Sequence, residues 1–297
     1  MICIIIPVHN RIKLTINCLD SLKKQTYKNF ITIVVDDGST DNTSNIIKEK
    51  FGNMVEVLSG DGNLWWAGAT NLGIKHIISK VKDEDLILTL NNDLLVKENY
   101  LEMLIKCWEK YPKSLIGSLV LYKNTTNKVN FGGKKWNNIT AKHSTIFKDG
   151  EIIDFKVVPE VICTDMLPGR GTLIPVKVFK LIGFYNNSSF PQYAADEDLS
   201  LRAKKKGYDL LVSTKSLVFS EVQETGINFK YDKPSFFNFI KSLYSIKSAN
   251  NLKVRFRFAR KHARFWVIYI VFDIIRLLGS FFRSFLRYYL KKHRQLV

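Results

Sequence analysis

The chain has 297 residues, of which 46% are hydrophobic, and its formal net charge is +18. This hydrophobic fraction excludes a disordered protein and suffices for one large core with an appendage. The charge is uneven: residues 229–297 hold 16 Lys and Arg against two acids, a net charge of +14, which leaves +4 for residues 1–228. We therefore predict a near-neutral globular domain over residues 1–228 and a basic region over residues 229–297.

The cysteines are scattered and lack the paired spacing of a zinc site or a disulfide framework. They lie at Cys3, Cys18, Cys107 and Cys163, a pattern that fits a reducing compartment. The chain opens directly on an apolar segment without a preceding basic stretch, so we expect no signal peptide. These features favour a location in the cytoplasm.

Apolar strands alternate with amphipathic helices over the first 60 residues. We expect strands at residues 2–8, 30–35 and 55–58, with helices at residues 14–24 and 43–51. Such alternation predicts a parallel sheet with right-handed crossovers. Polar residues follow the first two strands at once, in His9-Asn10-Arg11 and Asp36-Asp37-Gly38. In open α/β sheets, such strand ends border the ligand crevice.

A segment with four glycines, residues 60–73, follows the third strand and leads into a helix that we expect to reach Val81. Glycines let the backbone approach a ligand closely, but their spacing here matches neither a dinucleotide-binding motif nor a P-loop. The adjacent Trp65 and Trp66 are as consistent with core packing as with a ligand site.

The next strand, expected over residues 86–90, is a continuous apolar run of the kind that is buried on both faces of a sheet. It stops at Asn91, Asn92 and Asp93. Asp93 is a candidate ligand for a hard divalent cation, because a metal shared with a nucleotide needs only one or two carboxylates besides phosphate oxygens. The alternative is that the three residues cap a helix or form an Asx turn.

Further along, we expect a helix at residues 100–111, a strand at 115–122, hairpins or a mobile insertion at 123–154, and helices at 176–182 and 196–206. Arg170 lies between two glycines, where its planar guanidinium can meet phosphate or sugar hydroxyls, although a surface turn is the alternative. Asp196, Glu197 and Asp198 open the last helix. Acids are favoured there by the helix dipole, and a general base is the competing interpretation.

In their order, these segments resemble glycosyltransferase family 2, whose members have the GT-A fold, a Rossmann-like and mainly parallel sheet flanked by helices. The resemblance rests on residues 6–10, 34–41, 63–73, 91–93 and 196–202 and covers roughly residues 1–225. Together with the basic helical extension at the C-terminus, these segments are most similar to bacterial rhamnosyltransferase-like members that build surface polysaccharides.

The resemblance implies an inverting transferase that uses Mg²⁺ or Mn²⁺ and a UDP- or dTDP-linked sugar. It implies Asp93 as the metal ligand and Asp196 as the catalytic base. With Arg170 added, the donor-binding candidates are Pro7, His9, Asn10, Arg11, Asp36, Asn63, Trp65, Gly68, Asn71, Asn91, Asn92 and Arg170. The acceptor-side candidates are Trp66, Glu197 and Asp198.

Two positions depart from the family pattern. Asn91 stands where the family has the first Asp of its Asp-x-Asp motif. The family His after the last strand is missing from residues 220–224, where Glu221 is the candidate replacement. These departures motivate one alternative, a non-catalytic scaffold that binds sugar nucleotides at a membrane. The other alternative is a sugar-nucleotide nucleotidyltransferase, which would need a basic Gly-rich loop in place of His9-Asn10-Arg11.

The basic region combines aromatic and aliphatic residues with Arg and Lys over residues 256–290. Its longest apolar run, residues 265–272, is far shorter than the roughly 20 residues that span a bilayer. The composition is typical of a helix in the headgroup layer of an anionic membrane, here the inner face of the cytoplasmic membrane, near a saccharide or lipid-linked acceptor. The apolar density argues against nucleic acid. Packing of a helical pair on the body or on a second copy in a homodimer is the alternative.

Overall fold

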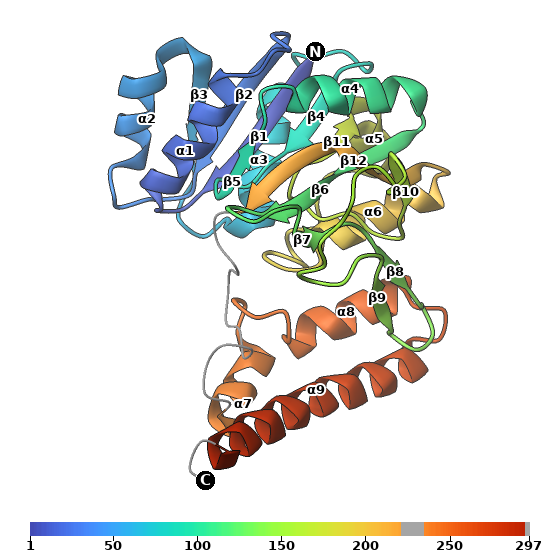
Figure 1. The fold of residues 1–297 in the computed structure, drawn as a ribbon. Coiled ribbons are helices and arrows are strands. Elements are labelled where there is room, and N and C mark those ends of the chain that lie inside the picture. Colours follow the sequence, from blue (N-terminus) through green and yellow to red (C-terminus); the bar gives the residue numbers. More distant parts are fainter. Residues whose placement is uncertain (221–234, 295–297) are drawn as a thin grey trace. The chain divides into compact units, whose positions relative to one another are not determined.

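The computed structural model describes residues 1–220 and 235–294, which form two compact units (Figure 1). Among these residues, the first unit comprises 1–135, 144–191 and 195–220, and the second comprises 136–143, 192–194 and 235–294. The predicted domain boundary after residue 228 lies outside the described residues, as does Glu221, so both stay predictions.

The N-terminal half of the first unit is a parallel arrangement of strands and helices, as predicted. Its elements are β1 (Ile2–Val8), α1 (Ile12–Lys23), β2 (Phe30–Asp36), α2 (Thr43–Phe51), a 3₁₀ turn (Gly52–Met54), β3 (Val55–Ser59), α3 (Trp65–Ile77) and β4 (Leu86–Thr89). β1 pairs in parallel with β2 and β4, and β2 pairs in parallel with β3. β1 is covered on both faces, which explains its unbroken apolar run.

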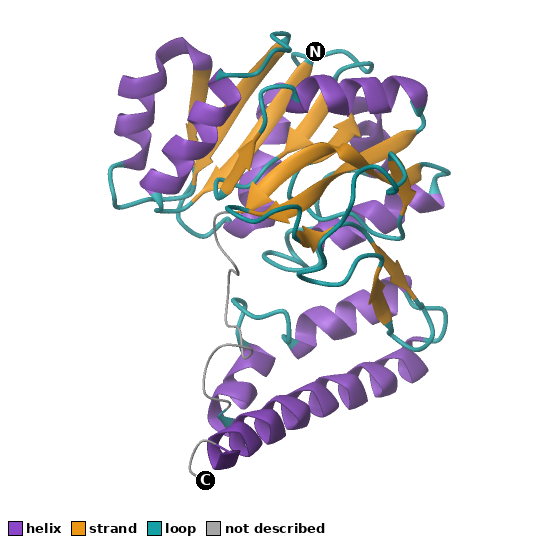
Figure 2. Ribbon diagram, in the orientation of Figure 1, coloured by secondary structure: helices purple, strands orange, loops and turns teal. Residues whose placement is uncertain are grey.

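The C-terminal half of this unit is mixed. Its elements are β5 (Leu94–Val96), α4 (Tyr100–Lys110), β6 (Ser114–Tyr122), β7 (Val129–Phe131), β8 (Lys134–Trp136), β9 (His143–Thr145), β10 (Val161–Cys163), β11 (Thr172–Pro175), α5 (Val176–Ile182), α6 (Ala195–Lys205) and β12 (Asp209–Ser220). The main sheet has the order β10-β12-β6-β11-β4-β1-β2-β3, with β5 on β12 and β7 on β6. β11 runs antiparallel to both its neighbours. Figure 2 shows the strands between layers of helices, which confirms the predicted α/β class.

Helix α3 corrects the prediction for residues 60–73. It begins at Trp65 and ends at Ile77, so most of the Gly-rich segment is helical. A Cβ at Gly73 would lie 2.7 Å from Ile5 Cγ2 and 3.1 Å from Val35 Cγ2. Gly73 therefore lets α3 pack closely on β1 and β2 and does not approach a ligand.

The second unit contains α7 (Phe236–Tyr244), α8 (Leu252–His262) and α9 (Trp266–Arg294). Phe239 of α7 packs on Leu277 and Phe281 of α9, while Ala259 of α8 packs near Tyr269. The helices predicted from the composition of residues 256–290 are thus present. Within the described residues, no helix combines the length and the apolar content that crossing a bilayer requires.

The close packing of α3 can be tested with a matched pair of Gly→Ala variants in helices. Gly73→Ala gains about 1 kcal/mol of helix propensity but overpacks the core at a cost of about 1–3 kcal/mol, so we expect a net loss of stability of about 1 kcal/mol. Gly279→Ala in α9 meets no atom within 4 Å, and we expect it to raise stability. Thermal unfolding followed by circular dichroism measures both. Equal effects of the two substitutions would contradict the packing argument.

Candidate active site

The loops after β1 and β2 are bound to each other. The Asn10 amide donates to Ser39 Oγ at 2.7 Å, and the Thr40 amide donates to Asn10 Oδ1 at 3.0 Å. Asn10 and Arg11 both adopt left-handed backbone conformations, with φ of 58° and 66°. Such backbone conformations are unfavourable for residues other than glycine, and they are concentrated at functional sites. The exposed Arg11 side chain places Nη1 3.7 Å from Asp93 Oδ2.

Two adjacent acids follow β2, and both are buried. Asp36 accepts hydrogen bonds from the Ser39 amide at 3.0 Å and from the Ser44 hydroxyl. Asp37, which was not predicted as a site residue, accepts from the amides of Gly62 at 2.9 Å and Trp65 at 3.0 Å. Asp37 therefore fixes the start of α3. A polar hollow of about 230 Å³ adjoins Asp36; its other lining residues are Gly38, Ser39, Asn42, Thr43, Ser44, Asn45, Ser59 and Gly60.

The three polar residues after β4 have different surroundings. Asp93 is buried beside Arg11, in the turn between β4 and β5. Asn91 Oδ1 accepts a hydrogen bond from Trp66 Nε1 at 3.0 Å. Asn92 is buried, and its Nδ2 donates to Thr15 Oγ1 of α1 at 2.9 Å. This hydrogen bond ties the end of β4 to α1, and the role of Asn92 in donor binding stays a prediction.

Trp66 connects the end of β4 to the start of α6. A Cβ at Gly169 would lie only 2.0 Å from Trp66 Cζ2, so the indole packs directly on the backbone of Gly169. The Gly169 amide in turn donates to Asp196 Oδ2 at 2.9 Å. The edge of Trp66 also meets the Tyr185 ring at a centroid distance of 5.2 Å. The half-buried Trp66 is thus the contact that brings Asn91 and Asp196 into one packed cluster.

Asp196 is a half-buried carboxylate held by two backbone amides. Besides Gly169, the Glu197 amide donates to its Oδ1 at 2.9 Å. Burial raises the pKa of Asp196, and the negative charge of Glu197 raises it further, while Lys134 lowers it. A carboxylate with a raised pKa is a stronger base than an exposed one. Glu197 itself forms an ion pair with Lys134 of β8 through its Oε1 atom.

Lys134 is a residue of the site that the sequence did not reveal. It lies in the polar insertion between β6 and α5, where nothing in the pattern distinguishes it from several other lysines. Its position next to the Asp196 and Glu197 pair is a product of the tertiary fold alone.

Arg170 is half-buried in the same cluster, in the bend that precedes β11. Its Nη1 donates to Asn130 Oδ1 at 3.1 Å. Burial lowers the pKa of the guanidinium, whereas the negative charges of Asp93 and Asp196 oppose that effect. A positive charge therefore lies within electrostatic range of both acids.

Two further predicted residues belong to the core. Asn71 is buried and bonds at both ends of its amide to the Tyr185 backbone, at 2.8 and 3.0 Å. Asp198 is fully buried and accepts from Arg202 Nε at 2.8 Å. Arg202 also donates to the Phe184 carbonyl at 2.7 Å. Both side chains thus hold contacts within the protein, and their predicted roles, Asn71 as a donor contact and Asp198 as an acceptor contact, stay predictions.

The remaining donor-binding candidates differ in accessibility. His9 and Asn63 are exposed, whereas Pro7 and Trp65 are half-buried. His9 Nδ1 lies 2.6 Å from the Asp37 carbonyl oxygen. Gly68 is buried inside α3, where a Cβ would lie 3.1 Å from Leu64 Cβ. Its role in donor binding stays a prediction.

The described residues contain no group of three or more His, Cys, Asp and Glu side chains that could hold a metal ion. A divalent cation shared with a diphosphate nevertheless needs only one or two carboxylates from the protein. The buried carboxylate of Asp93, in the turn between β4 and β5, fits this minimal mode of binding.

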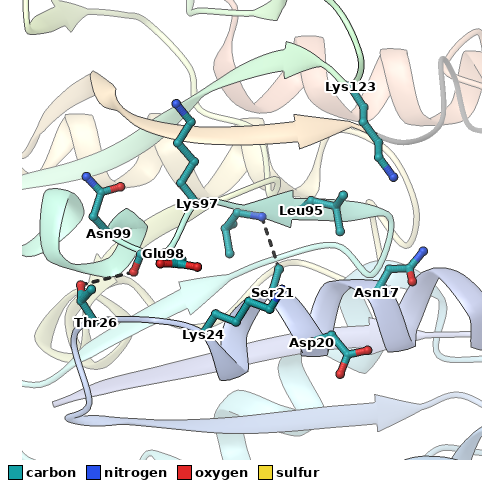
Figure 3. A pocket seen from close by; sticks show the side chains of 11 residues that line it. Asn17, Asp20, Ser21, Lys24, Thr26, Leu95, Lys97, Glu98, Asn99 and Lys123 are labelled. Carbon is teal, nitrogen blue, oxygen red and sulfur yellow. Dashed lines mark hydrogen bonds between the residues drawn. The ribbon is translucent and has the colours of Figure 1, made fainter.

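A second hollow, of about 770 Å³, lies between α1 and residues 95–99 (Figure 3). Its lining residues are Asn17, Asp20, Ser21, Lys24, Thr26, Leu95, Val96, Lys97, Glu98, Asn99 and Lys123. Acids and lysines alternate around it, and the Ser21 hydroxyl accepts from the Val96 amide at 3.3 Å. None of the predicted site residues lines this hollow, so its size does not make it the candidate active site.

Comparison with known proteins agrees with the geometry. The model of the family "Glycosyl transferase family 2" matches residues 3–163. Glycosyltransferase GlyG of Streptococcus pneumoniae serotype 4 is 34% identical over 125 residues, which are 41% of this chain and 40% of GlyG. An uncharacterized glycosyltransferase of Rickettsia conorii is 32% identical over 163 residues, or 55% of this chain and 24% of that protein. The chain thus matches less than half the length of these relatives.

Solved structures share the fold at low sequence identity. The mannosyltransferase PcManGT from Pyrobaculum calidifontis, in complex with GDP-Man and Mn²⁺, has a TM-score of 0.54 at 15% identity and covers 74% of this chain and 56% of its own. GalNAc-T7 with UDP, GalNAc and Mn²⁺ has a TM-score of 0.59 at 13% identity and covers 92% of this chain and 57% of its own. Because the family model matches more than half of the chain, the chain belongs to glycosyltransferase family 2.

Proposed function

We propose that the chain transfers a sugar, with inversion, from a UDP- or dTDP-linked donor to a saccharide or lipid-linked saccharide in bacterial surface-polysaccharide biosynthesis. Rhamnose is the sugar that we infer from the resemblance. The observation that carries the proposal is the packed cluster of Asn91, Trp66, Gly169 and Asp196. It sets a basic carboxylate beside the strand end at which α/β proteins bind their ligands.

Asp196 acts as the general base in this proposal. Its carboxylate accepts the proton of the acceptor hydroxyl while the hydroxyl oxygen bonds to the anomeric carbon. The bond from that carbon to the nucleoside diphosphate breaks on the opposite face, so the configuration inverts. The two amides that hold Asp196 fix its direction, and its raised pKa makes it a better proton acceptor.

Positive charge near Asp93 serves the diphosphate. Arg170 and Arg11 both lie near Asp93, and the planar fork of an arginine suits phosphate oxygens. Mg²⁺ or Mn²⁺ bound by Asp93 would supply further positive charge for the leaving group. PcManGT and GalNAc-T7 were both solved with Mn²⁺, which supports this assignment. Asp36 and the hollow beside it are proposed to receive the nucleobase.

We place the reaction at the inner face of the cytoplasmic membrane. The support is the net charge of +14 over residues 229–297, together with the exposed apolar side chains of α9. An anionic lipid surface attracts such a segment at about 1 kcal/mol per basic residue near it. A lipid-linked acceptor would then be presented where the enzyme is bound.

The first prediction of this proposal concerns Asp196→Asn, which keeps the size of the side chain and one acceptor oxygen for Gly169. We expect transfer to fall by about 10²- to 10⁴-fold, the usual contribution of a general base, with donor affinity unchanged. A panel of UDP-, dTDP- and GDP-sugars, read by thermal shift, identifies the donor. Transfer and donor affinity that fall by the same factor would make Asp196 a binding residue. Donor binding by the parent chain without transfer or hydrolysis would favour the non-catalytic scaffold.

The charges around Asp196 predict the pH dependence of kcat/KM. Because the base must be ionised, activity should rise with pH through a pKa above the ordinary value of Asp. Glu197→Gln removes a charge that raises this pKa, so the rise should move to lower pH. Lys134→Met removes a charge that lowers it, so the rise should move to higher pH. Shifts of both variants in the same direction would rule out Asp196 as the titrating group.

Asp93→Asn tests the metal assignment by binding as well as by activity. We expect Mn²⁺ to strengthen nucleoside diphosphate binding to the parent chain and to have little effect on the variant, because one carboxylate carries the protein's share of the metal site. Isothermal titration with EDTA or Mn²⁺ measures this. Asp83→Asn is the control. Asp83 is exposed, precedes β4 in the chain, and forms an ion pair with Lys180 of α5. An Mn²⁺ effect that survives in Asp93→Asn would exclude Asp93 as the ligand.

A further inference from the structure

Helix α9 has two apolar faces. One face packs inside the second unit through Tyr269, Leu277 and Phe281, which are buried against α7, α8 and residues 136–141. The other face is the outer stripe, a row of exposed apolar side chains three or four residues apart. The outer stripe comprises Val267, Val271, Ile275, Leu278, Phe282, Leu286 and Leu290, which are each 41–63% exposed. Residues at this spacing lie on one side of a helix.

The one acid of residues 235–294 does not lie on the outer stripe. Asp273 is buried, and its Oδ1 accepts from Arg255 Nη1 of α8 at 2.6 Å. The exposed charges along α9 are instead basic, as at Arg276, Arg283 and Arg287. Residues 235–294 as a whole hold 14 Lys and Arg. The outer stripe is therefore an apolar strip bordered by positive charge.

The length of the stripe is that of an interaction surface. At about 1.5 Å per residue, positions 267 to 290 extend over about 35 Å of helix. A continuous exposed strip of large apolar side chains on this scale marks a site of protein or membrane contact. α9 does not qualify as a membrane-spanning helix. The candidate partners for this face are a membrane surface along which the helix lies and the surface of another protein.

Charge decides between a membrane and a second copy of the chain. Pairing two outer stripes would bring two sets of basic side chains together, because the one acid of residues 235–294 in each copy is already paired with Arg255. An anionic lipid surface instead offers acyl chains to the stripe and phosphate groups to the arginines. The charge of the unit thus complements lipid and not itself.

We propose that the outer stripe of α9 is a lipid-binding face that lies in the headgroup layer of an anionic membrane, with the helix axis along the surface. The proposal extends the membrane setting of the proposed function. It does not depend on the transfer chemistry, because it is measured by binding alone.

The experiment is sedimentation of the full-length chain with phosphatidylglycerol or phosphatidylcholine vesicles over a series of salt concentrations. We expect binding to phosphatidylglycerol that weakens as salt rises. Ile275→Ser with Phe282→Ser should weaken it at least tenfold. The control, Ile152→Ser with Val157→Ser, removes apolar side chains of the first unit that are 72% and 78% exposed, against 58% for both Ile275 and Phe282, and should bind like the parent. Arg276→Gln with Arg283→Gln and Arg287→Gln should lower the salt dependence.

Several results would overturn the proposal. One is a parent chain that does not sediment with phosphatidylglycerol vesicles at low salt, and another is an outer-stripe variant that still binds like the control. A parent dimer in analytical ultracentrifugation, which the outer-stripe substitutions convert to a monomer without a change in vesicle binding, would assign the face to a second copy. Sugar transfer to a soluble acceptor is measured on the parent and on the same variants. If the parent and the variants transfer equally well but do not bind vesicles, only the lipid proposal fails. If the parent itself transfers no sugar, the result counts against the proposed function.

Discussion

The contact between the Trp66 ring and the backbone of Gly169 is the constraint on which the arrangement of the site depends. No side chain fits at position 169, because a Cβ there would overlap the indole. The same indole binds Asn91 at the end of β4, and the same glycine binds Asp196 at the start of α6. Strand end and carboxylate are therefore positioned by one packed contact. Transfer between two bound substrates requires positioning of this kind, since small displacements of a catalytic group reduce the rate strongly.

Burial shifts the pKa values of the acid and the arginine of this cluster in opposite directions, and the charges of neighbouring groups oppose both shifts. It raises the pKa of Asp196 and lowers that of Arg170, which disfavours the charged form of each. The negative charges of Asp93 and Asp196 stabilise the charged form of Arg170, and the positive charge of Lys134 stabilises the charged form of Asp196. Charges fixed before the substrate arrives need no reorganisation during reaction. Because arginines already face Asp93, a metal there would depend on the diphosphate for much of its ligand charge.

The sequence was sufficient for the first four strands and for the polar residues at their ends, because a continuous apolar run and an abrupt polar stop have few structural solutions. It did not reveal the protein partners of Asn71, Asn92 and Asp198. An amide or a carboxylate inside a motif looks the same whether it meets a ligand or a buried partner, and here the partners are Tyr185, Thr15 and Arg202. β5 and β10 were missed because each is three residues long and exists through pairing with β12.

Composition alone also could not sort the apolar residues of the basic region. Tyr269 and Val271 belong to one apolar run, yet the first is buried and the second is half-exposed. A helix that only had to pack on α7 and α8 would need apolar residues on the face that contacts them, and its other faces would carry polar side chains. α9 instead keeps Ile275 and Phe282 in water, where they contribute nothing to the core. The burial of Asp273 against Arg255 pairs the one acid of residues 235–294, which would otherwise repel lipid phosphate. The exposed surface of α9 is therefore apolar and basic at once, and these are the two properties on which the proposed lipid-binding face rests.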